Sequence, residues 1–136
     1  RFSNGLQCTA EVEKLDTAAD IALVNCTGVT GAPIITLGDS SSLEPADQVV
    51  ACGYDGARED QELPVGHEGY ITSFFLDKGT THIRSNAPIS PGYSGGALMT
   101  LDGKFVGLIT STEEDDQVNE QRSIALASND VLEVIA

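Results

Sequence analysis

The stretch PGYSGGALMTLDGKFVGLIT, residues 91–110, places a serine among three glycines and follows it with a hairpin signal. Because glycine accepts positive φ and has no Cβ, the backbone around Ser94 can turn its N–H groups toward one point beside the hydroxyl. Acyl transfer needs this pattern of a nucleophile next to preorganised oxyanion donors. A glycine-rich turn with a capping serine is the alternative. Further along, Asp102-Gly103 between two apolar runs predicts an antiparallel hairpin.

The sequence around this stretch is built from short segments with strand character. Alternating or apolar runs bounded by turn residues predict strands near residues 6–13, 21–24, 48–53, 65–75, 80–85 and 123–126. Residues 28–47 are rich in Gly, Ser, Pro and Asp, which is typical of a connection between two packing units. A short helix capped by Ser128 or Asn129 is predicted at the end. This pattern indicates an all-β barrel or sandwich.

Length and charge limit the possible classes. The chain has 136 residues, of which 40% are hydrophobic, so it suits one domain or a large part of one. Its 21 acidic residues against 7 Lys and Arg give a net charge of −14. We therefore expect neither nucleic acid nor an anionic membrane as a partner, since phosphate contacts need clustered Lys and Arg. No signal peptide is visible, and the absence of an initiating Met favours processing or trimming.

The cysteines and the acidic runs point to no metal site. Cys8, Cys26 and Cys52 fit no zinc spacing. Cys8 and Cys26 can face each other across a hairpin, which makes one disulfide possible, but three small buried thiols are the preferred interpretation. The acidic runs at 55–62 and 113–116 lack the spacing of a calcium loop and predict solvated loops. We expect no metal and no cofactor.

Three segments in this order resemble the trypsin-like serine peptidases, and among them the bacterial high-temperature-requirement (Deg) group. They are Asp20-Ile21-Ala22-Leu23, residues 91–98 and residues 103–108, and the resemblance runs from about Leu6 to the end. It implies two antiparallel six-stranded β-barrels with the active site between them, and it favours a secreted or periplasmic location. Residues 1–27 would then be a remnant of the first barrel, its closing hairpin. Residues 28–47 would cross over, and residues 48–136 would form the second barrel with the C-terminal helix.

The resemblance also implies roles for individual residues. Ser94 would be the nucleophile, Asp20 the acid that orients a histidine, and the backbone N–H groups of Gly92 and Ser94 the oxyanion hole. The substrate pocket would fall on the segments before the serine and after the hairpin. Its residues would be Asn86, Ala87, Pro88, Leu108, Ile109 and Thr110. Because no Asp stands among them, a small or medium apolar substrate side chain is favoured.

One departure concerns the general base. In the family the histidine precedes the aspartate, but His67 and His82 both follow Asp20, and we interpret both as ordinary surface or barrel histidines. The base would then lie on a segment cleaved away or in another chain, be missing from a truncated chain, or have been lost in evolution. Without it a serine is a poor nucleophile at neutral pH.

The sequence therefore predicts a serine endopeptidase acting on polypeptides, inactive as this chain alone. Exposed edge strands would favour pairing with the missing N-terminal segment or with another copy. A non-catalytic module that grips peptides through an edge strand is the alternative. Residues 92–96 also fit the G-x-S-x-G elbow of α/β-hydrolases, but a strand rather than a helix is predicted after the serine, which disfavours that class.

Overall fold

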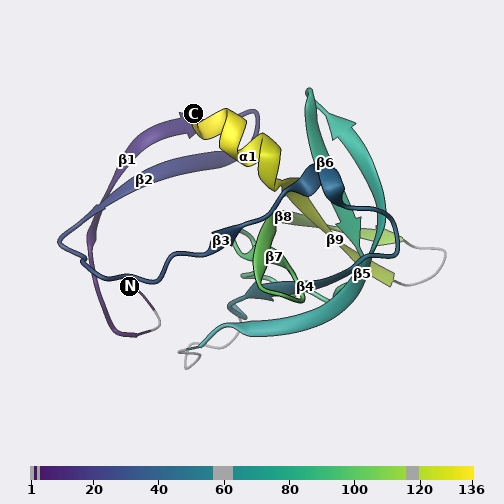
Figure 1. Ribbon diagram of the computed structural model, residues 1–136, viewed down its shortest axis with the longest axis horizontal. Helices are drawn as coiled ribbons and strands as arrows, with labels where there is room; N and C mark the ends of the chain where they lie inside the picture. Colours follow the sequence, from purple (N-terminus) through teal and green to yellow (C-terminus); the bar gives the residue numbers. More distant parts are fainter. Residues whose placement is uncertain (1, 3, 57–62, 116–119) are drawn as a thin grey trace.

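A computed structural model describes residues 2, 4–56, 63–115 and 120–136. A closed antiparallel barrel occupies its C-terminal part, with the strand order β8-β7-β4-β5-β6-β9 and closure by pairing of β8 with β9 (Figure 1). Its strands are β4 (Gln48–Gly53), β5 (Val65–Asp77), β6 (Thr80–Ser85), β7 (Ala97–Thr100), β8 (Lys104–Asp115) and β9 (Glu120–Ala127). The short strand β3 (Thr36–Leu37) pairs in parallel with β8. The prediction of an all-β barrel is confirmed.

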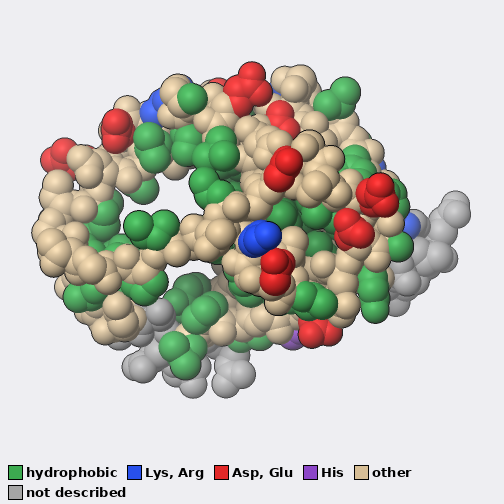
Figure 2. Space-filling view, in the orientation of Figure 1, with side chains coloured by type: hydrophobic (Ala, Val, Ile, Leu, Met, Phe, Trp, Pro, Cys, Tyr) green, Lys and Arg blue, Asp and Glu red, His purple; other side chains and the backbone are tan. Residues whose placement is uncertain are grey.

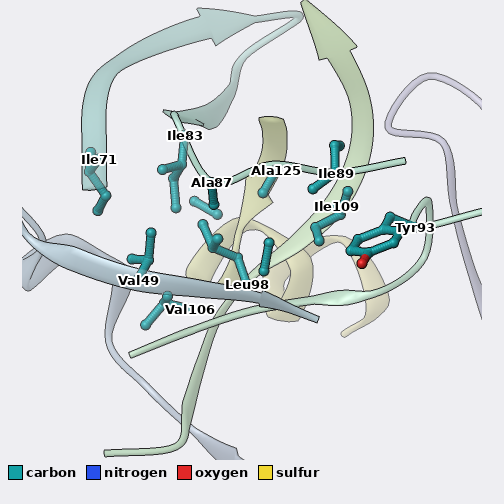
Figure 3. Close-up of a cluster of buried hydrophobic side chains, with 12 residues drawn as sticks. Val49, Ile71, Ile83, Ala87, Ile89, Tyr93, Leu98, Val106, Ile109 and Ala125 are labelled. Atoms are coloured by element: carbon teal, nitrogen blue, oxygen red, sulfur yellow. The ribbon is translucent and has the colours of Figure 1, made fainter. Parts of the chain in front are cut away.

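The barrel closes around a core of aliphatic side chains from every wall. On β4 the burial alternates, so that Val49 and Ala51 point inward, as expected for a strand with one solvated face. Leu98 on β7 and Val106 on β8 point into the same interior from the next two strands, and each is at most 1% exposed. Figure 3 shows these side chains converging with Tyr93, which enters the core from the loop that carries Ser94. Burial of Tyr93 therefore ties that loop to the barrel interior.

The N-terminal residues form a separate two-stranded hairpin of β1 (Thr9–Asp16) and β2 (Ile21–Thr27). A disulfide joins Cys8 to Cys26 with the Cα atoms 5.5 Å apart, so the preference for three free thiols was wrong. Cys52 is the free cysteine, and it is half-buried. The two strands pair with each other and, within the described ranges, with no further strand.

The hairpin carries apolar side chains that face solvent. Val12 and Leu15 are each 65% exposed, and Val24 is 51% exposed. Figure 2 shows openings between the hairpin and the barrel, with hydrophobic side chains along the rim. A hairpin of two strands buries too little surface to be stable alone. Its attachment to the barrel therefore depends on contacts at its turn end.

Those contacts come from the C-terminal helix α1 (Ser128–Ile135). Ile21, at the start of β2, packs with Leu126 of β9 and Val131 of α1 in a small apolar cluster. In addition, the Lys14 ammonium donates to the carbonyl of Ala136 at 2.8 Å. Among the described residues no helix is long and apolar enough to cross a bilayer.

The predicted helix cap was wrong. Ala127 occupies the N-cap position and has no capping side chain, and the Ser40 hydroxyl instead accepts the N–H of Asn129 at 3.1 Å. Ser128 instead donates its hydroxyl to the carbonyl of Gly38 at 3.0 Å, and the Asn129 side-chain carbonyl accepts the N–H of Ser40 at 3.2 Å. Both side chains therefore bind the segment that connects the hairpin to the barrel. These hydrogen bonds attach that segment to α1 at its 3-10 turn, η1 (Ser40–Ser42).

Candidate active site

Ser94 lies in a tight loop that its glycines allow. The Tyr93 N–H donates to the carbonyl of Ser90 at 3.1 Å, and the Gly96 N–H donates to that of Tyr93 at 2.8 Å. The Gly95 N–H bonds the carbonyl of Ile109 on β8 at 2.7 Å, which anchors the loop to the barrel. These bonds leave the amides of Gly92 and Ser94 without an acceptor within the described part of the chain.

Gly92 is required both by conformation and by space. Its φ is 106°, and a Cβ there would lie 2.3 Å from the Gly56 nitrogen and 2.6 Å from the Tyr54 oxygen. Because any other residue would clash with backbone, the loop can present its amides only with glycine at this position. Two unpaired N–H groups beside a hydroxyl are the arrangement that stabilises a developing oxyanion.

The Ser94 side chain is exposed and weakly held. Its hydroxyl donates to the carbonyl of Thr110 on β8 at 3.1 Å. Ser94 lines two cavities, of about 340 Å³ and about 450 Å³. Neither cavity is lined by a histidine of the described residues. The hydroxyl can therefore be approached from either cavity, and its hydrogen-bond acceptor is a backbone carbonyl.

Tyr93 holds the loop from the other side. Its ring is 2% exposed and stacks on the ring of His67 from β5, with centroids 6.2 Å apart. Burial raises the pKa of the Tyr93 phenol, and the Asp55 carboxylate raises it further. The phenol is consequently neutral across the physiological range. His67 thus packs behind the loop, on a core residue, and makes no hydrogen bond to Ser94 among the described contacts.

Asp20 stands at the turn end of the hairpin. Asp16 shapes this turn by accepting the N–H groups of Ala18 and Ala19 at 3.0 and 2.9 Å. Asp20 itself has a φ of 56°, a left-handed conformation that Asp tolerates better than most residues. The neighbouring Ile21 is buried against the barrel and α1 and so fixes where Asp20 lies. The Asp20 side chain is exposed.

Asp20 and Ser94 line adjoining cavities. A third cavity, of about 380 Å³, lies between the hairpin turn and strands β5, β6, β8 and β9, and Asp20 lines it. Residues 110–112 of β8 line both this cavity and the larger one at Ser94. The hairpin turn and the serine loop therefore lie on either side of the same segment of β8. His82 also lines the Asp20 cavity, where it stacks on Phe75 with ring centroids 5.1 Å apart.

The residues expected to form the substrate pocket separate in the structure. Of the six, only Thr110 lines the larger cavity at Ser94. Asn86 accepts the N–H of Tyr70 at 2.7 Å, and Pro88 is exposed. Ala87 and Ile109 are in the main core, and Leu108 packs against the cluster under α1. The cavity is lined instead by Ile89, Ser90, Pro91, Ser111, Thr112 and Glu114, together with Ser94 and Thr110.

A second cluster beside the site has no signal in the sequence. Arg84 on β6 pairs with Glu113 on β8 at 2.6 Å between Nε and Oε2. Its guanidinium also lies over the Phe75 ring, 4.1 Å from the centroid. These residues are brought together by strand register, which single-strand patterns do not reveal. Among the described residues no three His, Cys, Asp or Glu side chains converge as metal ligands would.

Comparison with known proteins agrees with this architecture. The trypsin-like peptidase domain family matches residues 1–108. The chain therefore belongs to the trypsin-like serine peptidase family, as its motifs predicted.

Relatives within this family are HtrA-type proteases. The serine protease Do-like HtrA of Bacillus subtilis is 31% identical over 135 residues, which cover 94% of this chain and 30% of the relative. Serine protease PepD of Mycobacterium tuberculosis is 32% identical over 123 residues, covering 79% of this chain and 25% of PepD. The predicted likeness to the high-temperature-requirement group is thus confirmed. The chain spans less than a third of the length of either protein.

A solved structure shows the same fold. The HtrA-type protease AlgW, determined with a decapeptide, aligns with a TM-score of 0.81 at 23% identity. The alignment covers 96% of this chain and 40% of AlgW. Both the barrel and the attached hairpin therefore have a counterpart in a trypsin-like protease.

Proposed function

We propose that this chain carries the nucleophile, the oxyanion hole and the orienting acid of a serine endopeptidase. Ser94 attacks the peptide carbonyl, the amides of Gly92 and Ser94 receive the oxyanion, and Asp20 orients an imidazole. The observation that carries the proposal is the pair of unpaired amides beside an accessible hydroxyl, in a loop that requires Gly92 at a φ of 106°. Family membership supports the reaction type.

The imidazole comes from outside this chain in the proposed enzyme. The Ser94 hydroxyl donates to a backbone carbonyl, and the described histidines lie elsewhere, His67 behind the loop on Tyr93 and His82 on Phe75. The exposed apolar face of the hairpin supports pairing with further strands, from an N-terminal segment or from another copy. Such strands would bring the base to Asp20. This chain alone is then expected to hydrolyse peptides very slowly.

A fluorophosphonate probe on the natural-length protein tests this proposal. Such a probe bonds covalently to a serine only where a base and an oxyanion hole activate it. We expect labelling at Ser94, loss of labelling in Ser94→Ala, and strong slowing in Asp20→Asn. Labelling of a different serine, or a rate in Asp20→Asn equal to that of the unmodified protein, would contradict these assignments.

A non-catalytic peptide-binding module is the second candidate, and one feature of β8 favours it. Strand β7 pairs with β8 only as far as Leu108, and Ile109 bonds the serine loop. Residues 111–114 pair with β9 on one side, whereas their other edge meets no strand of the described chain. An open edge of this kind can bind an extended peptide by strand addition. Peptide binding by the natural-length protein without any labelling of Ser94 would select this candidate.

A further inference from the structure

The Asp20 cavity lies beside the open edge of β8, next to the larger cavity at Ser94. Its volume is about 380 Å³, and residues 110–112 connect it to the larger Ser94 cavity. A peptide that pairs with this edge advances about 3.3 Å per residue and turns alternate side chains to one face. One of its side chains therefore lies over the Asp20 cavity whenever the backbone occupies the edge. The lining of that cavity then decides which side chain fits.

The single arginine in the lining already has an acidic partner. Arg84 pairs with Glu113 at 2.6 Å, lies over the ring of Phe75 and donates to the Ser73 hydroxyl at 3.4 Å. Its side chain is 24% exposed, so its charge is compensated largely within the wall. The ion pair leaves this part of the lining nearly neutral. Among the described residues that line the cavity, no Lys or Arg is left unpaired for an acidic side chain of a peptide.

The carboxylates of the lining that have no ion-pair partner give the Asp20 cavity a negative charge. Asp77, at the end of β5, and Asp20, at the hairpin turn, reach the cavity from two different elements. Neither carboxylate forms an ion pair within the part of the chain that the structure describes. In the proposed enzyme Asp20 faces an imidazole, which leaves Asp77 to contact the substrate. Ala18, Ala19 and Ile124 supply apolar lining that suits a methylene stem.

We propose that this cavity selects a lysine or arginine side chain of the bound polypeptide, with Asp77 as the specificity-determining carboxylate. The inference rests on the proposed function in either form, peptidase or peptide-binding module, because it requires a peptide along β8. It assigns a preference to a position away from Ser94 itself. The net charge of −14 acts in the same direction by attracting basic peptides.

Binding of labelled peptides to this chain tests the inference without requiring catalysis. Fluorescein-labelled extended octapeptides of neutral residues would carry one Lys, Gln or Glu at each position in turn, with affinity read by fluorescence anisotropy. We expect Lys at one position to bind about three- to fivefold more tightly than Gln there, the size of one partly exposed ion pair. Glu at that position should bind more weakly than Gln. The Lys advantage should shrink at 0.5 M salt.

Two variants locate the effect. Asp77→Asn should abolish the Lys advantage and leave the affinity of the Gln peptide unchanged, which also shows that the variant is folded. Asp130→Asn removes the same charge from α1, outside the cavity, and should keep the Lys advantage. Equal binding of Lys and Gln peptides at every position, or a Lys advantage that survives Asp77→Asn, would overturn the inference while peptide binding stands. If no octapeptide binds, the proposed function fails, and the inference fails with it.

Discussion

Replacing Gly96 by alanine tests how tightly the serine loop is built into the barrel. A Cβ at this position would lie 2.2 Å from the carbonyl oxygen of Cys52 on β4 and 2.8 Å from that of Tyr93. Both neighbours are backbone, so no side chain can rotate away. Relieving the closer contact to an ordinary distance needs a shift of about 1 Å, because repulsion rises steeply inside van der Waals contact.

The expected cost follows from what must move. Overpacking a core with side-chain atoms costs about 1–3 kcal/mol, and a backbone clash belongs at the upper end. The shift would also disturb the pairing of Cys52 with Ala97 and the bond from the Ile109 N–H to the Gly96 carbonyl. We therefore expect Gly96→Ala to lower the free energy of unfolding by about 3 kcal/mol. A loop displaced by about 1 Å should also slow fluorophosphonate labelling at Ser94 about 100-fold in the natural-length protein.

Gly103→Ala is the matched control. Gly103 has a φ of 81° in the β7–β8 turn, and a Cβ there would meet nothing within 4 Å. Gly103→Ala should lower the free energy of unfolding by only about 1 kcal/mol, because alanine tolerates a positive φ less well than glycine, and it should leave labelling of Ser94 unchanged. Urea unfolding followed by circular dichroism would measure both variants. A Gly96→Ala protein as stable as the unmodified chain, or more stable than Gly103→Ala, would show that the loop is not locked against β4.

Three further predictions concern the hairpin, the segment that connects it to the barrel, and the Asp20 cavity. Replacing Cys8 and Cys26 by serine opens a loop with a sequence separation of 18. It should destabilise the hairpin by about 3 kcal/mol, seen as faster hydrogen exchange in β1 with no change in the barrel strands. Hydrogen bonds from Ser41, then from Asn129, hold the pKa of Asp39 below its usual value. Stability from this carboxylate is therefore present above its unfolded pKa of about 4 and lost as pH falls through the lower folded pKa, so the urea midpoint of Asp39→Asn should depend less on pH below about 4. Arg84→Met should cost about 1–2 kcal/mol in urea unfolding, since it removes both the ion pair and the contact with the Phe75 ring, whereas Glu113→Gln should cost less than about 1 kcal/mol.

Local signals in the sequence were enough to predict an all-β barrel or sandwich, and the family resemblance selected the barrel. Asp102-Gly103 between apolar runs specifies the β7–β8 hairpin, and alternation along residues 48–53 predicts a strand with one buried face, as β4 has. These features depend only on neighbours in the chain. The cap of α1 could not be predicted in the same way. Ser128 and Asn129 are good capping residues, but the structure uses them to bind residues 38–40, about 90 positions away in the chain.

The candidate site likewise combines features encoded in a short stretch of sequence with features that depend on distant strands. The glycines around Ser94 predict a loop with presented amides, because that geometry is encoded within five residues. The lining of the cavities depends instead on register between distant strands. A bulge in β8 between Ile109 and Ser111 changes which residues face which way, and the structure buries Ile109 while Ser111 and Thr112 line the cavity. The irregularity leaves no mark in the sequence of β8, so the motif alone does not indicate which residues line the cavities.

The distribution of stability over the chain explains why the nucleophile and the acid need not be equally well ordered. The serine loop is anchored by Tyr93 in the main core and by two hydrogen bonds to Ile109. Asp20 depends on a hairpin held at its turn end by Ile21 and at its strand by Lys14, with both strand edges otherwise open in the described chain. Local opening should therefore release Asp20 long before it disturbs Ser94. A partner strand on the hairpin would stabilise the acid in its working position, because binding to the closed form alone shifts the equilibrium toward it. In the proposed enzyme, delivery of the base and ordering of Asp20 would thus be one event.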